Sequence, residues 1–300
     1  MKIVIAGGTG SIGSKLVEIL KDHHELIILS RSKNKIISKN LRIVNYSRNN
    51  NDWYSYLNKS DVIINLVGES INNRRWTKKQ KKIILNSRLD SVTRISQALS
   101  SINYKPKLIM NASAVGYYSY SDKRQDESDT HGNHFLSEVC LKWENKVTKE
   151  FFSKSDRLAI LRIGVVLDSN SGILSKLSFL FKCGVGAIIG NGRQKLSWID
   201  IDDVSRAIDY IINSDMKGAI NLVSPISETN YSFSKKLGKV FKKPVFLKIP
   251  KIFIRLLLGE MSQIVINGSN IYPKALLKSG YQFQFPKLID SLKKNYSNIS

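Results

Sequence analysis

Seven residues near the start of the chain constrain its fold more than any other feature. The sequence Gly7-Gly8-Thr9-Gly10-Ser11-Ile12-Gly13 follows an apolar segment, Lys2–Ala6, and leads into Ile12–Lys21, where apolar residues have helical spacing. Glycines at every third position allow a tight strand-to-helix turn whose backbone N–H groups can approach a diphosphate. The alternative is a turn that only packs the helix against the strand. We favour a dinucleotide-binding loop, because strand, glycines and helix occur in the required order. We expect its cofactor contacts at Gly7, Thr9, Gly10, Ser11, Ile12 and Gly13.

Apolar runs of strand length alternate with longer amphipathic segments along the first two thirds of the chain. We expect strands at Lys2–Ala6, Glu25–Leu29, Asp61–Leu66, Lys107–Met110, Leu158–Val166 and Ala219–Val223, and helices that include Lys78–Leu99 and Phe135–Phe152. Strands that are apolar on both faces belong to parallel sheets covered by helices. The sequence therefore predicts an α/β fold with a Rossmann-type, doubly wound parallel sheet.

The last third of the chain has a different pattern, which predicts a smaller, mixed α/β C-terminal lobe. We expect a short strand at Val245–Lys248, a helix at Phe253–Leu258 and an aromatic strand at Tyr281–Leu288. Residues 1–167 and 196–224 would form the dinucleotide-binding domain, and residues 168–195 and 225–300 the substrate-side lobe. A chain of 300 residues can bury a core of that size without disulfides.

The charge balance bears on possible partners. The chain has 47 Lys and Arg against 24 Asp and Glu, a net charge of +23, with 34 Lys and 13 Arg scattered along it. Base recognition favours Arg, and strand binding needs interleaved aromatic residues. Neither pattern is present, so we predict a small-molecule substrate and no nucleic acid, and attraction of an anionic small ligand stays an alternative.

Composition also suggests the setting in which the protein works. Two cysteines are too few for a disulfide framework, and no apolar run is long enough to span a membrane. The four histidines lack metal-ligand spacing. We therefore expect a cytoplasmic protein with no membrane partner and no metal, either a monomer or a homodimer.

The end of the second predicted strand indicates which nicotinamide cofactor is bound. An Asp or Glu there would hold the ribose 2′-hydroxyl of NAD. The chain instead has Leu29-Ser30-Arg31-Ser32-Lys33, in which Arg31 can pair with a 2′-phosphate. We predict NADP as the cofactor and NAD as the less favoured one. The alternative is that Arg31 and Lys33 are only exposed loop charges.

Further motifs occur in a fixed order along the chain. They are Asn65-Leu66-Val67-Gly68, Gly68-Glu69-Ser70-Ile71, Arg75-Trp76-Thr77, Asn86-Ser87-Arg88, Ser113–Tyr118, Phe135–Cys140, Trp143-Glu144, Leu161–Leu167 and Gly190–Trp198. With these motifs the whole chain resembles the extended short-chain dehydrogenases/reductases. More narrowly, it resembles an atypical branch of the NAD(P)-dependent epimerases/dehydratases, the sugar-nucleotide-epimerase-like "epimerase family". The resemblance implies further cofactor contacts at Leu66 and Gly68.

The resemblance also implies where catalytic residues lie and which of them are missing. Most members of the superfamily use a Ser, a Tyr and a Lys, with a nearby Asn. The Ser is present as Ser113, whereas the Tyr, Lys and Asn positions fall on Leu136, Cys140 and Arg88, a pattern that the atypical branch shares. We expect Ser113, Tyr117 or Tyr118, Cys140 and Arg88 to line one pocket beside the nicotinamide, with Arg88 supplying the missing positive charge or lowering the pKa of Cys140. The alternatives are a buried, inert Cys140 and an Arg88 that pairs locally.

Three more residues are substrate candidates. They are Tyr118, beside Tyr117; Trp76, in a polar loop; and Arg193, in the glycine-rich segment before Trp198. Seven positive charges between Arg74 and Arg88, with no acid, could attract an anionic substrate or form a solvated helix face.

The resemblance therefore implies an enzyme that acts on a sugar nucleotide or a similar small molecule by transient hydride transfer. Because the Tyr–Lys pair is missing, the alternative is an NAD(P)-binding sensor or regulator without redox turnover.

Overall fold

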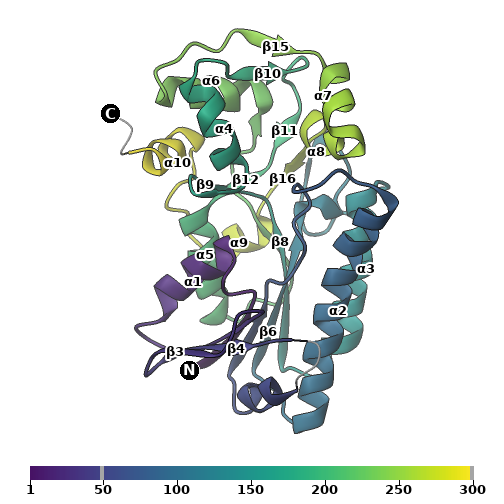
Figure 1. Cartoon of the computed structure of the whole chain (residues 1–300), viewed down its shortest axis with the longest axis vertical. Helices are drawn as coiled ribbons and strands as arrows, with labels where there is room; N and C mark the ends of the chain where they lie inside the picture. The colour runs from purple at the N-terminus through teal and green to yellow at the C-terminus, as the bar shows by residue number, and fades with distance from the viewer. Residues whose placement is uncertain (48–50, 298–300) are drawn as a thin grey trace.

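An eight-stranded sheet forms the centre of the larger part of the chain in the computed structural model, which describes residues 1–47 and 51–297 (Figure 1). Neighbouring strands are parallel except for the edge pair β3–β4. In spatial order the strands are β13 (Gly218–Leu222), β8 (Arg157–Ile163), β6 (Leu108–Ala114), β5 (Val62–Asn65), β1 (Lys2–Ala6), β2 (Glu25–Ser30), β4 (Leu41–Asn45) and β3 (Lys35–Ser38).

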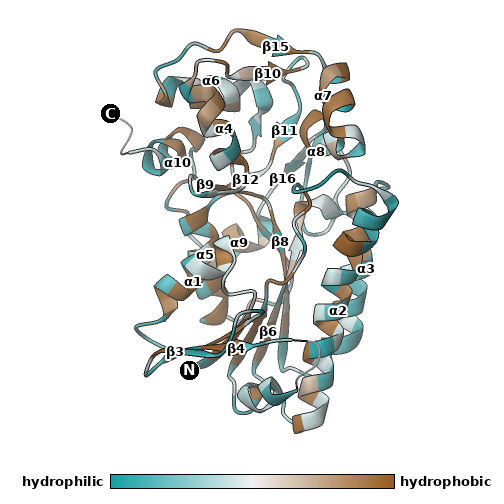
Figure 2. Ribbon diagram, viewed as in Figure 1, coloured by the Kyte–Doolittle hydropathy of each residue, from teal (hydrophilic) through white to brown (hydrophobic). Residues whose placement is uncertain are grey.

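Helices cover this sheet because its strands are apolar on both faces. Ile3, Val4 and Ile5 of β1 have no exposed surface, and Figure 2 shows hydrophobic residues concentrated along the central strands. Two helices packed together, α1 (Ser11–Leu20) and α5 (Ile201–Ile212), lie on one side, and α2 (Lys78–Ile102) and α3 (Phe135–Phe151) lie on the other (Figure 1). Single 3₁₀ turns, η1 (Asp52–Leu57) and η2 (Val115–Tyr117), complete this part.

The order of the strands confirms the predicted doubly wound α/β fold. The chain builds β2 and β4 on one side of β1, then returns to place β5, β6, β8 and β13 on the other side. Such a reversal opens a crevice at the carboxyl ends of the strands, where ligands of open α/β sheets bind. The glycine loop follows β1 and therefore lies at this crevice.

The smaller lobe is built from short two-stranded sheets and helices. Its paired strands are β9 (Val165–Asp168) with β12 (Trp198–Asp200), β10 (Ala187–Ile189) with β15 (Leu247–Ile249), β11 (Lys195–Leu196) with β14 (Glu228–Thr229) and β16 (Ser269–Ile271) with β7 (Ser121–Gln125). Its helices are α4 (Gly172–Lys182), α6 (Asn230–Val240), α7 (Lys251–Leu258), η3 (Gly259–Ser262), α8 (Gln263–Ile266), α9 (Lys274–Lys278) and α10 (Leu288–Asn295). A separate hydrophobic core that includes Phe181, Trp198 and Leu237 lies in this lobe, although Trp198 falls within residues 196–224, which the proposed division gives to the larger domain. Among the described residues, no helix combines the length and the apolarity that crossing a bilayer would need.

The single strand expected at Leu158–Val166 is wrong, because Gly164 divides it into β8 and β9. A Cβ atom on Gly164 would lie 2.7 Å from the Val223 side chain and 2.8 Å from the Ser197 carbonyl oxygen. A side chain at position 164 would collide with these groups, so glycine is what lets the backbone pass so close to them. The backbone N–H of Val165 then donates to the Ser197 carbonyl at 2.9 Å. The bend carries the chain from the large sheet into the small sheet that β9 forms with β12.

The strand expected at Tyr281–Leu288 is also absent. The backbone N–H groups of Gln284 and Phe285 donate to the two carboxylate oxygens of Asp203, at 2.7 and 2.8 Å, and not to a neighbouring strand. The ring of Tyr281 is buried in the core of the large sheet. A side-chain carboxylate thus holds this segment, which is why its alternating aromatic pattern was misleading.

Candidate functional site

The glycine loop has the close backbone packing that a diphosphate site needs. Gly7 has φ +83°, a left-handed conformation that favours glycine, and a Cβ there would lie 3.1 Å from the Leu66 carbonyl carbon. A Cβ on Gly13 would lie 2.5 Å from the Gly7 carbonyl oxygen and 2.6 Å from the Gly8 Cα atom. The loop is thus held between β1, β5 and α1 with no room for side chains at these two positions.

The amino terminus of α1 is open at this loop. Its N-cap residue, Gly10, offers no side-chain acceptor, and the first turn contains no acidic residue. The first N–H groups of a helix have no intrahelical partners and carry a partial positive charge. The residues here therefore fit a dinucleotide diphosphate; Thr9 and Ser11 are exposed beside it and Ile12 packs against the core.

Ser11 has partners that sequence reasoning missed. Its hydroxyl donates to Asp168 Oδ2 at 2.9 Å, and the Ser171 hydroxyl donates to Ser11 Oγ at 2.7 Å and to the same carboxylate oxygen. Although burial acts to raise the pKa of Asp168, hydrogen bonds from the Asn170 amide and from these two hydroxyls lower it overall. These contacts join the glycine loop to the β9–α4 connection. Their partners are 157 or more residues apart in sequence, so no local motif predicts them.

Arg31 and Gly68 follow the two strands that flank β1 in the sheet. Arg31 follows β2 and is exposed, and the described residues include no recorded partner for its guanidinium. Gly68 follows β5, and a Cβ there would lie 3.1 Å from Arg88 Cζ. Glycine at this position thus lets the Arg88 side chain lie against the backbone that leaves β5.

Arg88 lies on α2 and is held from several directions. Its Nη1 donates to the carbonyl oxygens of Glu69, at 3.1 Å, and Ile84, at 2.8 Å. Its guanidinium lies 5.1 Å from the centre of the Trp143 ring. Burial lowers the pKa of Arg88, whereas Cys140 and Glu69 act to raise it.

The structure brings Cys140 close to Ser113 and Arg88. The thiol lies on α3, is 4% exposed, and is within hydrogen-bonding reach of Ser113 and of the Ala114 backbone. Burial raises the pKa of Cys140 to about 11, with the charge of Glu144 acting in the same direction and Arg88 only partly opposing it. Arg88 thus acts in the expected direction but is outweighed by burial and by Glu144, so at neutral pH the thiol stays protonated.

Ser113 belongs to a buried polar network whose connections the sequence analysis did not predict. Its hydroxyl donates to Glu144 Oε1 at 2.6 Å. Both oxygens of that carboxylate accept from Arg162, at 3.0 and 2.8 Å, and Arg162 Nη1 also donates to the Tyr118 hydroxyl at 2.9 Å. Burial alone would lower the pKa of Arg162, but the hydrogen bonds and charge of Glu144 raise it above its usual value. The one available signal was an arginine within the otherwise apolar run of β8, because a buried charge needs a partner.

The two neighbouring tyrosines have different surroundings. Tyr117 is half-buried, with its ring centre 3.6 Å from the guanidinium carbon of Arg162. Tyr118 is fully buried, and its hydroxyl also donates to Asn221 Oδ1 at 2.7 Å. Burial raises the pKa of Tyr118 to about 12. We therefore keep Tyr117 in the proposed pocket and leave out Tyr118, whose hydroxyl is engaged within the protein.

The two other substrate candidates differ in burial. Trp76 is 5% exposed, donates from its indole nitrogen to the Ile71 carbonyl at 2.8 Å and packs edge-on against Phe135, which makes it part of a small core. Arg193 is exposed in the turn between β10 and β11. Trp76 in this position stabilises the loop that follows β5 and is not a free cover for a pocket.

Native-state thiol titration should distinguish the two cysteines. We expect one thiol per chain, the exposed Cys183, to react promptly with a disulfide reagent at neutral pH. The buried Cys140 should react only after unfolding, because the reagent cannot reach its sulfur and the thiol stays protonated at neutral pH. In a Cys183→Ser control the prompt reaction should disappear, and two prompt thiols in the parent protein would contradict the assignment.

Comparison with known proteins agrees with this geometry. Residues 3–138 match the model of the NAD dependent epimerase/dehydratase family, and residues 249–294 match a domain of unknown function, DUF1731. The chain is 35% identical over 295 residues to Epimerase family protein SH2119 of Staphylococcus haemolyticus, covering 96% of each protein.

Solved structures give the same result. The crystal structure of human epimerase family protein SDR39U1 with NADPH superposes with a TM-score of 0.86 and 28% identity, covering 99% of this chain and 100% of that one. A UDP-glucuronic acid 4-epimerase from Bacillus cereus, in complex with UDP-glucuronic acid and NAD, shares the fold at a TM-score of 0.79 and 17% identity, covering 100% of this chain and 99% of that one. The chain therefore belongs to the NAD-dependent epimerase/dehydratase family, within the branch named epimerase family proteins.

Proposed function

We propose that the protein binds NADP and acts as an epimerase or oxidoreductase on a sugar nucleotide or a similar small hydroxyl or carbonyl compound. The observation that carries this proposal is the glycine loop, which leaves no space for a Cβ at Gly7 or Gly13 and ends at an uncapped helix. Binding of NADPH by the human relative supports NADP as the cofactor. Gly7, Thr9, Gly10, Ser11, Ile12 and Gly13 would hold the diphosphate, with Leu66 and Gly68 beside it.

When bound, the nicotinamide supplies a hydride acceptor or donor. The chain's own residues would place the substrate and hold its protons. The Ser113 hydroxyl proton is directed at Glu144, so Ser113 Oγ retains lone pairs that can accept a hydrogen bond from a substrate hydroxyl. Arg88 would supply positive charge, and Cys140 would contribute a neutral thiol.

Tyr117 is the group that we propose to carry the transferred proton. The hydroxyl proton of Ser113 is occupied by a carboxylate, and Cys140 is held protonated by burial. Tyr117 is half-buried and lies in η2, the turn that follows β6, which is the strand that carries Ser113. A phenol at this position can donate a proton to a carbonyl oxygen or accept one from a hydroxyl.

A sensor or regulator is the second candidate. It is favoured by one observation: where the resemblance expects a lysine, the chain has a buried thiol whose pKa is about 11, which carries no charge at neutral pH. Incubation with NADP(H) and a panel of UDP-sugars and simple carbonyl compounds separates the two. Change in nicotinamide absorbance or interconversion of sugar isomers supports the enzyme. Tight NADPH binding without turnover across the panel supports the sensor.

Arg31 should determine the preference for NADP. In an Arg31→Ala variant we expect the Kd for NADPH to rise roughly 10- to 100-fold, because a charge-assisted contact to the 2′-phosphate would be lost. The Kd for NADH should stay unchanged. Lys33→Ala, two residues further on, is the matched control and should leave both constants near the parent values. Equal losses for NADPH and NADH in Arg31→Ala would contradict the role of Arg31.

A further inference from the structure

The outer side of α7 is apolar and exposed. Ile252, Phe253, Leu256 and Leu257 are 55%, 61%, 69% and 66% exposed, whereas Ile254 is buried. Residues spaced by one, four and five positions lie on one side of a helix, so these four form a single face. Isolated exposed apolar residues are ordinary on protein surfaces, but contiguous ones mark a contact surface.

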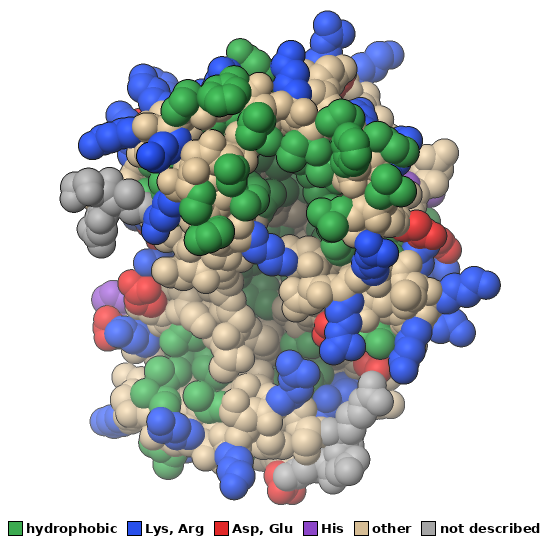
Figure 3. Space-filling view, turned by 45° about the horizontal axis from the view of Figure 1, so that its top comes forward, with side chains coloured by type: hydrophobic (Ala, Val, Ile, Leu, Met, Phe, Trp, Pro, Cys, Tyr) green, Lys and Arg blue, Asp and Glu red, His purple; other side chains and the backbone are tan. Residues whose placement is uncertain are grey.

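The apolar face continues onto the strand before α7. Phe246 is 71% and Leu247 is 43% exposed, and β15 pairs with β10, the strand that follows α4. Figure 3 shows hydrophobic side chains gathered over this lobe, with Lys and Arg side chains around them. We refer to Phe246, Leu247, Ile252, Phe253, Leu256 and Leu257 as the apolar surface.

The apolar surface lies in a part of the chain that has no negative charge in its sequence. Between Glu228 and Glu260 there are eight Lys and Arg and no Asp or Glu. Between Asp168 and Asp200 there are four Lys and Arg, and again no Asp or Glu. Lys243, Lys248 and Arg255 are exposed next to the apolar residues. The charged residues that these two stretches carry next to the exposed hydrophobic side chains are therefore all positive.

The inner side of α7 is fixed to the larger domain. Arg75 Nη2 donates to the carbonyl oxygens of Leu256, at 3.1 Å, and Leu257, and Lys81 pairs with Glu260 just beyond the helix. Contacts with the body of the protein are thus made by the backbone and by the buried Ile254. The apolar side chains on the other side remain available.

We propose that the apolar surface docks this lobe on the surface of an anionic phospholipid bilayer. An amphipathic helix with apolar residues on one side and Lys and Arg around them inserts shallowly into the headgroup region, and each nearby cation adds attraction to anionic lipid. A second copy of the chain would bring the same positive charge against this one, which disfavours self-association. The expectation of no membrane partner came from the absence of a spanning segment, which surface binding does not require.

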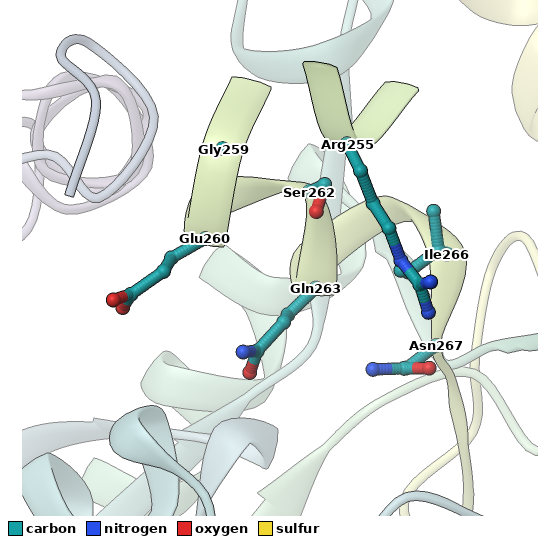
Figure 4. Close-up of a pocket in the computed structure, with 7 residues that line it drawn as sticks. All are labelled: Arg255, Gly259, Glu260, Ser262, Gln263, Ile266 and Asn267. Carbon is teal, nitrogen blue, oxygen red and sulfur yellow. The ribbon is translucent and has the colours of Figure 1, made fainter. Parts of the chain in front are cut away.

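An open pocket of about 510 Å³ under α7 offers a place for a lipid phosphate. Arg255, Gln263 and Asn267 line it together with Glu260, whose carboxylate is paired with Lys81, and Figure 4 shows their polar side chains. A guanidinium and two amides can together donate several hydrogen bonds to phosphate oxygens. The pocket thus adds headgroup recognition next to the residues that would enter the bilayer.

Vesicle co-sedimentation tests this inference with the full chain. We expect binding to equimolar phosphatidylglycerol–phosphatidylcholine vesicles and none to pure phosphatidylcholine, with added salt weakening it. In Phe253→Ser/Leu256→Ser the partition coefficient should fall roughly tenfold or more, because two exposed apolar anchors are lost. Phe152→Ser, which removes an aromatic ring that is 74% exposed on the larger domain, is the matched control and should bind like the parent.

A charge variant and the oligomeric state complete the test. Lys243→Glu/Lys248→Glu should also weaken binding to anionic vesicles, and it changes only exposed residues, so it covers the case in which the apolar variant fails to fold. Absence of sedimentation with either lipid would overturn the proposal. Unchanged vesicle binding by a folded Phe253→Ser/Leu256→Ser variant would also overturn it. A third contrary result is a parent protein that does not bind vesicles but is dimeric in solution, with the dimer dissociated by this variant. None of these outcomes depends on NADP binding.

Discussion

A Gly13→Val variant should lose saturable NADPH binding and about 1–3 kcal/mol of unfolding free energy. The new Cβ would meet the Gly7 carbonyl oxygen at 2.5 Å and the Gly8 Cα atom at 2.6 Å. Both obstacles are backbone atoms, so α1 must move away from the loop, and the amides that would hold the diphosphate move with it. Calorimetric titration with NADPH and urea unfolding measure the two effects.

Gly10→Ala is the steric control in the same loop. Gly10 has φ −77°, and its added Cβ would lie 3.3 Å from the Gly7 carbonyl oxygen, a contact that a small shift relieves. We expect a cost below about 1 kcal/mol in unfolding free energy. Should Gly13→Val prove too unstable to purify, Gly13→Ala carries the same contact with less bulk. Retention of the parent's NADPH affinity by a Gly13 variant would contradict the proposed site.

An Arg162→Met variant should lose about 3–5 kcal/mol of unfolding free energy. Arg162 makes two hydrogen bonds to the Glu144 carboxylate, and without them the Ser113 hydroxyl is the one donor to that buried group among the described residues. The Tyr118 hydroxyl also loses a donor. Urea unfolding of the variant and the parent provides the comparison.

Two further variants make this prediction specific. Lys142→Met removes an exposed ion pair with Glu138, four residues away on the same helix as Glu144, and should cost less than about 1 kcal/mol. Adding Glu144→Gln to Arg162→Met removes the uncompensated charge and should recover part of the loss. A cost for Arg162→Met no larger than that for Lys142→Met would show that the buried pair contributes little.

Local patterns in the sequence account for the large sheet and for the glycine loop. Apolar runs such as Lys2–Ala6 need burial on both faces, and Gly7, which follows that run, has a left-handed conformation that few other residues adopt. Helices α2 and α3 were predicted to within a few residues because their apolar spacing extends over several turns. Features that depend on neighbours close in sequence were thus predictable.

Contacts between distant segments could not be read from local patterns. Asp203 holds the backbone of Gln284 and Phe285, 81 and 82 residues away, and turns an apparent strand into a loop. The pair of Glu144 and Arg162 joins a helix to a strand across the core, and although each residue lies in a quoted motif, nothing in either motif shows that the two pair with each other. The pKa of Cys140 likewise depends on burial, which its sequence neighbours do not fix.

The central claim is that the loop after β1 holds the diphosphate of a nicotinamide dinucleotide. Isothermal titration of the purified full chain with NADPH, and separately with NADH, tests it most directly. The account predicts saturable binding of NADPH at one molecule per chain, tighter than that of NADH. No measurable binding of either dinucleotide would contradict it.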